Sequence, residues 1–294
     1  MTAIRKPTLT DMALIVSLGF IWGTSFLAIK FAVREFAPTS VAAIRIWIAF
    51  VMLFGVMLWK GQRFSLNPKF WGAILFVGIF NTSMPFFLIS WAEQTVDSGI
   101  AALLMGTSPL LAMVGSHFTT NDDHLSAPKL IAVALGMTGV LLVVGVEAVT
   151  GLGRNLIAQL AIFSASLCYV ASGMFVRRFT HVSVESFTAA ILLVGALSLT
   201  PWLAHSAMQA GGIATVKPLL ALLYLGLVPT GLAYLIRFYL IRSVGYSYTV
   251  LGIYIIPVVG VLLGNLVLGE PLETTTLLAL ALIISGIVYA RLKA

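Results

Sequence analysis

Long apolar stretches separated by short polar connectors run along this sequence and limit the folds it can adopt. A helix that crosses a bilayer needs about 20 mostly apolar residues, and ten stretches of this kind can be counted. They cover residues 12–33, 38–59, 70–92, 97–118, 128–147, 156–176, 183–203, 217–240, 247–268 and 273–291. The strands of a β-barrel would instead be short and alternating. Because backbone groups in lipid must satisfy one another, we expect an all-α integral membrane protein with ten transmembrane helices.

The composition agrees with a chain that lies in lipid. Hydrophobic residues make up 60% of the 294 positions and charged residues 9%, against roughly 45–50% and 25% in soluble domains. The longest connectors, such as 60–69 and 204–216, are too short to fold as separate domains. We expect residues 12–33 to be retained, because they are too long for the core of a cleaved signal. Cys168 is the single cysteine, so an intramolecular disulfide is excluded.

Basic residues are distributed unevenly between the two sides of such a bundle. One side would carry Arg5, Lys6, Lys60, Arg63, Lys69, Lys129, Arg177, Arg178, Arg237, Arg242, Arg291 and Lys293, and the other Lys30, Arg34, Arg154 and Lys217. Connectors rich in Lys and Arg stay in the cytoplasm. We therefore expect a multi-pass protein of the plasma membrane, the inner membrane of a bacterium, with both termini cytoplasmic. The basic residues behind the net charge of +7 then set the orientation of the protein in the membrane, and no nucleic-acid partner is expected.

A weak internal repeat divides the chain into halves, residues 1–147 and 148–294, with five apolar segments in each. A shift of 148 positions places Gly78 on Gly226, Thr82 on Thr230 and Pro109 on Pro257. Five is odd, so the second half would enter the membrane from the opposite side. That arrangement is the inverted-topology repeat of many carriers, whose solute site lies between the halves near the midplane. We expect two inverted five-helix repeats around a central cavity.

Prolines interrupt several of the apolar segments. A proline inside a helix leaves the carbonyl four residues earlier without its N–H partner. The carbonyls freed in this way are those of Met105, Ile253, Asn81 and Leu225, which precede Pro109, Pro257, Pro85 and Pro229. A freed carbonyl could face a watery cavity, where water or a substrate ammonium group would pair with it, or a neighbouring helix. We interpret the matched pair Pro109 and Pro257 as hinges, with a static kink as the alternative.

Small residues follow each of these two prolines at the same distance. Ala112 and Ser116 follow Pro109, and Gly260 and Gly264 occupy the same places in the second half. Such pairs let helix backbones approach closely, so we favour helix packing over contact with a solute.

Charged residues are scarce inside the segments. No carboxylate lies in the middle of one, and Arg45 is clearly within one. We expect Arg45 to extend toward the outer interface, with a freed carbonyl or a substrate carboxylate as the alternative contact. Lys30 and Arg237 lie near segment ends, where we expect them to reach lipid headgroups. The central cavity should therefore be polar and largely uncharged.

Aromatic and small polar side chains remain as candidates for contact with a solute. The predicted substrate-binding residues are Trp22, Asn81, Trp91, Ser108, Tyr169, Tyr234 and Tyr254. An aromatic face attracts an ammonium group by roughly 0.5–2 kcal/mol, and hydroxyl groups and carbonyls can hold the two ends of a zwitterion. Helix packing is the alternative role for each of these residues.

No motif for catalysis, metal binding or cofactor binding is present. The histidines, His117, His124, His181 and His205, lie at segment ends or in connectors without the spacing of a zinc site. The sequence contains neither a P-loop nor a dinucleotide-binding glycine motif. We expect no enzyme activity, no catalytic residue, no metal and no cofactor.

Several phrases resemble the drug/metabolite transporter superfamily, EamA type, over essentially the whole chain. They are FIWGTSFLAIKFA (20–32), APTSVAAIRIWIAF (37–50) and LGEPLETTTLLALALIISGIVYA (268–290). Trp22-Gly23, Arg45 and Gly269-Glu270 match short family motifs, whereas Asn121-Asp122 stands where the second half has Gly269-Glu270. Within the superfamily the chain is most similar to the YddG-type amino-acid exporters. The resemblance implies ten helices, a central cavity and export of amino acids or related small amphiphiles.

These observations predict a secondary transporter that exports amino acids or similar small amphipathic metabolites by alternating access. The alternative within the same fold is a broad-specificity exporter of drugs or other cationic compounds. A channel-like pore of this fold and an intramembrane enzyme are further alternatives. The expected partners are a small-molecule solute and the lipid bilayer, and a monomer is compatible with the sequence.

Overall fold

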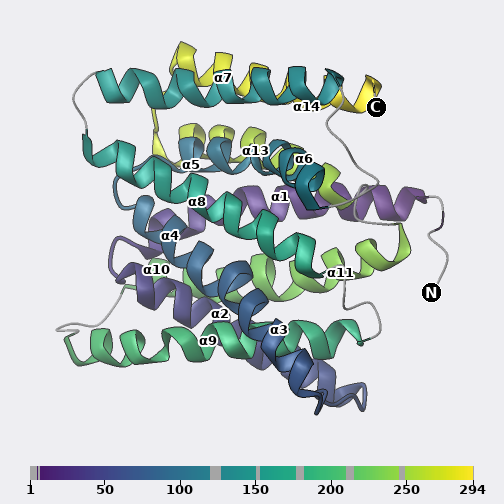
Figure 1. The fold of residues 1–294 in the computed structure, drawn as a ribbon. Coiled ribbons are helices and arrows are strands. Elements are labelled where there is room, and N and C mark those ends of the chain that lie inside the picture. Colours follow the sequence, from purple (N-terminus) through teal and green to yellow (C-terminus); the bar gives the residue numbers. More distant parts are fainter. Residues whose placement is uncertain are drawn as a thin grey trace.

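The computed structural model describes residue 5 and residues 7–119, 127–149, 153–176, 182–209, 215–244 and 249–293, and every regular element in them is helical (Figure 1). The first part of the chain forms α1 (Leu9–Ala32), α2 (Pro38–Trp59), α3 (Pro68–Gly78), η1 (Ile79–Ser83), α4 (Met84–Ala92), α5 (Ser98–Met105), α6 (Ser108–Thr119) and α7 (Ala127–Val149). The second part forms α8 (Gly153–Val176), α9 (Val184–Gln209), α10 (Val216–Leu225), η2 (Gly226–Leu232), α11 (Ala233–Ser243), η3 (Val250–Tyr254), α13 (Ile255–Leu263), η4 (Gly264–Leu268) and α14 (Thr274–Lys293).

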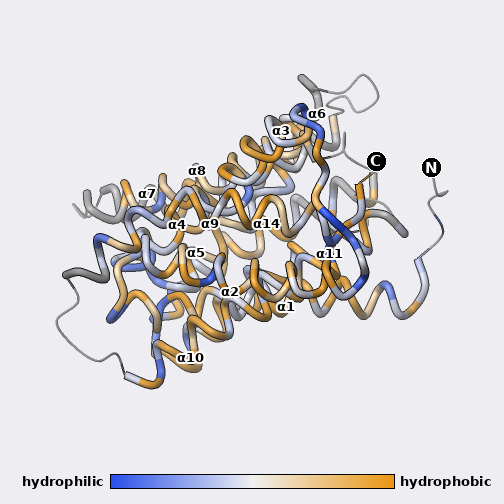
Figure 2. The backbone as a smooth tube through the Cα atoms, turned by 90° about the horizontal axis from the view of Figure 1, so that it is seen from below, coloured by the Kyte–Doolittle hydropathy of each residue, from blue (hydrophilic) through white to orange (hydrophobic). Residues whose placement is uncertain are grey.

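The helices have the length and apolar character that a bilayer requires. Within the described residues, 6 are long and apolar enough to cross a membrane, and shorter apolar helices lie beside them. The six are Leu9–Ala32, Pro38–Trp59, Pro68–Ala92, Leu156–Gly173, Val184–Ser206 and Val216–Ile241. Figure 2 shows apolar residues along most of each helix, with hydrophilic residues gathered toward the ends and connectors. The start of α1 and the end of α14 lie at the same end of the bundle, on the right in Figure 1.

The helices of the first part pack against those of the second in matched pairs. Helix α2 contacts α9 and η2, and α9 in turn contacts α2 and η1. Helix α5 packs on α13, and α7 packs on α14 at one edge of the bundle (Figure 1). Helix α1 lies against α10 and α13, while α8 lies against α4, α5 and α6. Exchanging the two parts therefore reproduces the pairs α2 with α9, α5 with α13 and α7 with α14, and it matches the contact of α2 with η2 to that of α9 with η1.

Two π-helical segments, η1 and η2, interrupt long helices at matched positions. The causes are Pro85, which follows η1, and Pro229, which lies inside η2, since each removes a backbone donor and displaces the preceding turn. Thr82 donates its hydroxyl to the carbonyl of Gly78, and Thr230 donates to the carbonyl of Leu225 over 2.8 Å. Thr82 and Thr230, which the internal repeat aligns, therefore play the same part, since each hydroxyl donates to a backbone carbonyl of the preceding turn.

Glycines bring the halves into close contact at these segments. A Cβ atom added at Gly78 would lie 2.8 Å from Cβ of Val194 in α9, and one added at Gly226 would lie 2.5 Å from Cβ of Ile48 in α2. Gly260 is equally tight, with an added Cβ only 2.1 Å from Cβ of Ala102. The helix-packing role predicted for Gly260 is confirmed.

The two prolines interpreted as hinges lie where their helices change form. Helix α5 ends at Met105, and α6 begins at Ser108, so Pro109 occupies the second position of α6. Pro257 is the third residue of α13, directly after the 3-10 segment η3. The carbonyl of Met105 accepts a hydrogen bond of 2.7 Å from the hydroxyl of Ser108, so a neighbouring side chain satisfies it. Whether these positions flex remains a prediction.

Candidate solute-binding site

Asn81 and Tyr234 form the centre of a buried polar network between the two halves. Asn81 lies in η1 and is 1% exposed, and Tyr234 in α11 is 3% exposed. The Tyr234 hydroxyl donates to the backbone carbonyl of Asn81 over 2.9 Å and approaches its Oδ1 at 3.2 Å. Asn81 Nδ2 donates to Oγ of Ser172 in α8 over 2.8 Å. The carbonyl freed by Pro85 therefore receives a tyrosine hydroxyl in place of water.

Arg45 in α2 is a buried cation beside this network. Its Nε and Nη2 donate to Oγ1 of Thr230 over 3.2 and 3.0 Å. The guanidinium carbon also lies 3.8 Å from the ring centroid of Phe86, which is a cation–π contact. Arg45 is only 4% exposed, so the interpretation that it extends to the outer interface is wrong. Packing of α2 against η2 encloses it instead, and its hydrogen bonds end on a threonine rather than on a carboxylate.

Trp22 connects α1 to the second half. Its indole Nε1 donates to the carbonyl of Pro229 over 3.1 Å. Two residues along the chain, the hydroxyls of Thr24 and Tyr224 share a hydrogen bond of 2.6 Å. Trp22 is partly buried against the apolar cluster that includes Phe26 and Ile29. Trp22 thus combines a hydrogen bond to the backbone of η2 with packing against this apolar cluster.

The other predicted site residues fall into two groups. Tyr169 is partly buried and packs against two apolar clusters, one containing Phe26 and the other containing Phe86, so it belongs with the central network. Ser108 donates to the carbonyl of Met105 at the end of α5, Tyr254 packs on the cluster around Leu103, and Trp91 is 38% exposed. The structure therefore joins Asn81 to Tyr234 directly and packs Trp22 and Tyr169 against an apolar cluster that they share.

Sequence reasoning did not select Ser172, Thr230 or Phe86 as site residues, although all three contact the network. Thr230 was noticed only as the repeat partner of Thr82, and its position directly after Pro229 was the available signal. Phe86 directly follows Pro85 and gave no signal apart from its aromatic ring.

Polar contacts also hold one end of the bundle together. Lys30 Nζ donates to the backbone carbonyls of Glu93 and Val96 over 2.9 and 2.7 Å. The prediction that Lys30 reaches lipid headgroups is therefore wrong, because the turn after α4 offers two unpaired carbonyls within its reach. Glu93 is 0% exposed, and no hydrogen bond to its carboxylate oxygens is present among the described residues.

Glu270 shows what the glycine–glutamate motif does in this chain. Gly269 adopts φ of 70°, a left-handed conformation that favours glycine, and so turns the chain after η4. The Glu270 carboxylate then accepts from the backbone N–H groups of Ser98 and Gly99 over 2.8 and 2.9 Å, and from the Ser98 hydroxyl over 3.0 Å. An acidic group at a helix N-terminus satisfies unpaired donors and the helix dipole. Asn121 and Asp122, its counterparts in the first half, lie outside the described residues.

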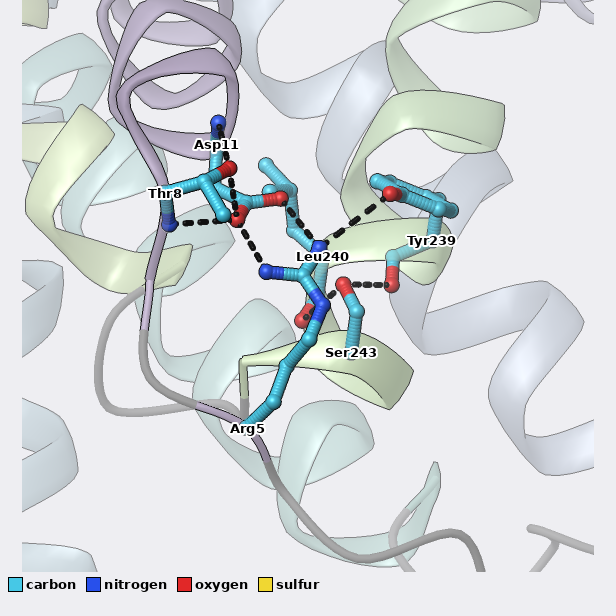
Figure 3. Close-up of polar contacts among 6 residues, drawn as sticks. All are labelled: Arg5, Thr8, Asp11, Tyr239, Leu240 and Ser243. Atoms are coloured by element: carbon cyan, nitrogen blue, oxygen red, sulfur yellow. Dashed lines mark hydrogen bonds and ion pairs between the residues drawn. The ribbon is translucent and has the colours of Figure 1, made fainter.

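A second network holds the opposite end of α1 (Figure 3). Thr8 and Asp11 form a reciprocal capping box at the start of the helix. Arg5 donates to both carboxylate oxygens of Asp11 over 2.5 and 2.9 Å and to the hydroxyl of Tyr239 over 3.3 Å. The hydrogen bond to Asp11 raises the pKa of Arg5 above its ordinary value. This network joins the segment before α1 to α11.

No cluster of three or more His, Cys, Asp or Glu side chains suited to a metal ion occurs in the part of the chain that the structure describes. His124 and His181 lie outside that part. The arrangement offers hydrogen-bond donors, aromatic faces and one buried guanidinium, which are groups for holding a solute.

Comparisons with known proteins agree with this architecture. A sequence model of the EamA-like transporter family matches residues 10–145 and 156–292. The uncharacterized transporter YoaV of Bacillus subtilis (strain 168) is 24% identical over 93% of this chain and 94% of its own. The uncharacterized inner membrane transporter YedA of Escherichia coli (strain K12) is 27% identical over 94% of this chain and 89% of its own.

One further relative and one structure extend the comparison. Protein PagO of Salmonella typhimurium is 27% identical over 97% of this chain and 93% of its own. A solved structure, described only as the crystal structure of a protein, superposes with a TM-score of 0.71 at 21% identity and covers 98% of both chains. At this identity the likeness shows the fold alone.

Proposed function

This chain belongs to the EamA-like transporter family, and from that premise we propose that it is a secondary transporter exporting amino acids or similar small amphipathic metabolites. As a member of that family it is a membrane transporter and not an enzyme. The finer statements that follow, on topology, substrate and direction, are parts of the proposal.

The proposed topology is ten transmembrane helices in two inverted five-helix repeats, residues 1–147 and 148–294. Its support is the exchange of contacts between the halves and the matched interruptions at η1 and η2. Both termini would face the cytoplasm, and the inner membrane relative YedA supports a plasma-membrane location. Rocking of the two repeats about a central site would give alternating access, with Pro109 and Pro257 as hinges.

The proposed substrate class rests on one observation, the positive charge of the buried Arg45 beside the network. Arg45 is buried and has no acidic partner within ion-pairing distance among the described residues, since its hydrogen bonds end on Thr230. A lone buried cation favours an incoming carboxylate and repels a cation. The aromatic rings and carbonyls of Trp22, Tyr169 and Tyr234 can accept an ammonium group. A zwitterion fits this set better than a cationic drug, which remains the second candidate because of the family fold.

Reconstitution into liposomes tests the proposal. A panel of radiolabelled amino acids and a panel of cationic dyes are offered with and without a pH gradient. We expect saturable amino-acid flux with counterflow, reduced about tenfold by Trp22→Ala, because an aromatic–ammonium contact and a hydrogen bond together contribute roughly 1–2 kcal/mol. The matched control is Trp59→Ala at the exposed end of α2, where the side chain is 84% exposed. Flux of dyes alone would establish the alternative, and linear flux without counterflow would indicate a pore.

A further inference from the structure

Glu93 is a buried carboxylate that the proposed solute site does not use. It follows α4 by one residue, just beyond the apolar stretch Pro68–Ala92, and it is 0% exposed. Neither carboxylate oxygen has a hydrogen-bond partner among the described residues. Carboxylates stay ionised in proteins when water, cations or N–H donors stabilise the charge, and buried charges are normally paired. In this conformation an ionised Glu93 is shielded from bulk solvent and has no hydrogen-bond donor among the described residues.

The two basic side chains that influence Glu93, those of Lys30 and Arg45, donate their hydrogen bonds to other groups. Lys30 donates to the backbone carbonyls of Glu93 and Val96 rather than to the carboxylate. Arg45 donates to Thr230. Both therefore influence Glu93 only at longer range.

Other carboxylates lie at this end of the bundle. Glu270 is held by the N-terminus of α5, and Asp97 is the N-cap residue of that helix. Burial raises the pKa of Glu93 well above its ordinary value; Lys30 and Arg45 oppose this shift, and Glu270 adds to it. Burial also raises the pKa of Asp97; Glu270 and Glu273 add to that shift and Lys30 opposes it. The neighbouring charges thus do not cancel the rise that burial causes in the pKa of Glu93.

Contacts between separate elements enclose Glu93. Lys30 joins the end of α1 to the connector that follows α4, and Glu270 joins the connector after η4 to the start of α5. These contacts must separate if this end opens, and water then reaches Glu93. Closure and exposure of the carboxylate are therefore linked by the same set of hydrogen bonds.

We propose that Glu93 is a proton-binding site, protonated while this end of the bundle is closed and ionised when it opens. The inference rests on the proposed function, because it requires a transporter that alternates between open and closed ends. The proton comes from the adjoining aqueous phase and forms an O–H bond with one carboxylate oxygen. No other bond breaks, and opening returns the proton to the same phase. In the proposed topology that phase is the outer one, so transport depends on outer pH.

Infrared pH-difference spectroscopy of the purified protein tests proton binding without any solute. We expect the C=O stretch of a protonated carboxyl group near neutral pH, lost in Glu93→Gln and retained in Glu273→Gln, an exposed carboxylate at the same end. Glu270→Gln keeps Glu93 and should move the disappearance of the band to lower pH, because it removes both a neighbouring negative charge and a closing contact; this variant provides a test if Glu93→Gln does not fold. An unchanged band in Glu93→Gln, or displacement of the band by sodium ions at constant pH, would overturn the proposal.

Transport in proteoliposomes tests the coupling separately, with the panel of labelled amino acids as the probe. Flux should vary with pH on the side of Glu93 by up to about tenfold per pH unit, the limit for a single proton, and Glu93→Gln should flatten that profile. Equal pH profiles in both proteins would overturn the coupling. Absence of flux for every solute would instead refute the proposed function, while the infrared result would still decide whether Glu93 binds a proton.

Discussion

The hydroxyl of Tyr234 donates to the backbone carbonyl of Asn81 over 2.9 Å and supplies the hydrogen bond that Pro85 removes from the helix. The two residues are 153 positions apart, so a defect in one repeat is satisfied by a side chain from the other. The site residues are thereby also structural contacts between the repeats.

Replacing Tyr234 by Phe should destabilise the protein while preserving its shape. The change leaves the carbonyl and Oδ1 of Asn81 without this donor, at a cost of about 1–3 kcal/mol for a buried unsatisfied group. Thermal unfolding in detergent measures the effect as a lower Tm. Tyr289→Phe is the matched control, because no hydrogen bond of its hydroxyl to a described residue is present. Equal Tm values for the two variants would contradict the structural role of the Tyr234 hydroxyl.

Arg45 and Thr230 should be energetically coupled. Lysine keeps the charge but lacks the planar fork that donates twice to Thr230 and stacks on Phe86, so Arg45→Lys should lower stability by about 1–3 kcal/mol. A double-mutant cycle with Thr230→Val should give a coupling of about 0.5–3 kcal/mol. Arg34→Lys, at an exposed position in the connector after α1, should change stability by less than about 0.5 kcal/mol. Additive effects in the cycle would show that the two side chains act independently.

Much of the fold follows from the sequence because lipid imposes a simple rule on long apolar stretches. The predicted segments 70–92 and 217–240 correspond to α3–η1–α4 and α10–η2–α11. The chain positions where helices are interrupted could be predicted too, since Pro85 and Pro229 remove particular backbone bonds. Their form could not, because a π-helical turn depends on how Gly78 and Gly226 fit against the opposite repeat.

The partners of the polar residues were harder to predict for a physical reason. Asn81 and Tyr234 could be chosen singly as polar groups in lipid, but their contact depends on how two distant segments pack. Arg45, inside its segment, and Lys30, near a segment end, were both expected to reach the interface, because long basic side chains can extend along a helix toward water. Arg45 instead donates to the hydroxyl of Thr230, and Lys30 donates to the backbone carbonyls of Glu93 and Val96. Glu93 was overlooked because it lies one residue past its apolar segment, where the sequence alone indicates exposure to water.

Gly260→Ala should disrupt the contact between α13 and α5. The added methyl group would lie 2.1 Å from Cβ of Ala102, so the helices must move apart, which typically costs about 1–3 kcal/mol. Gly55→Ala in α2 is the control, since nothing lies within 4 Å of its added Cβ, and it should be neutral or slightly stabilising. Combining Gly260→Ala with Ala102→Gly should restore much of the lost Tm. Failure of this rescue would mean that the methyl group clashes elsewhere.

Glu35 should contribute stability that is lost in acid. Its carboxylate accepts from the backbone N–H and the hydroxyl of Thr215 over 2.7 and 2.5 Å and so links the connector after α1 to the start of α10. These hydrogen bonds, the one from the hydroxyl first, lower the pKa of Glu35 below its ordinary 4.5.

The sign of the pH dependence follows from that direction. A carboxylate whose pKa is lowered by folding stabilises the folded state above its unfolded pKa, and the contribution disappears as pH falls through the folded value. The difference in Tm between wild type and Glu35→Gln should therefore be present at about pH 7 and vanish well below pH 4.5. Thr215→Ala, which keeps the backbone donor, should show a smaller difference over the same range. A difference that persists unchanged in strong acid would mean that Glu35 acts through its shape and not through its charge.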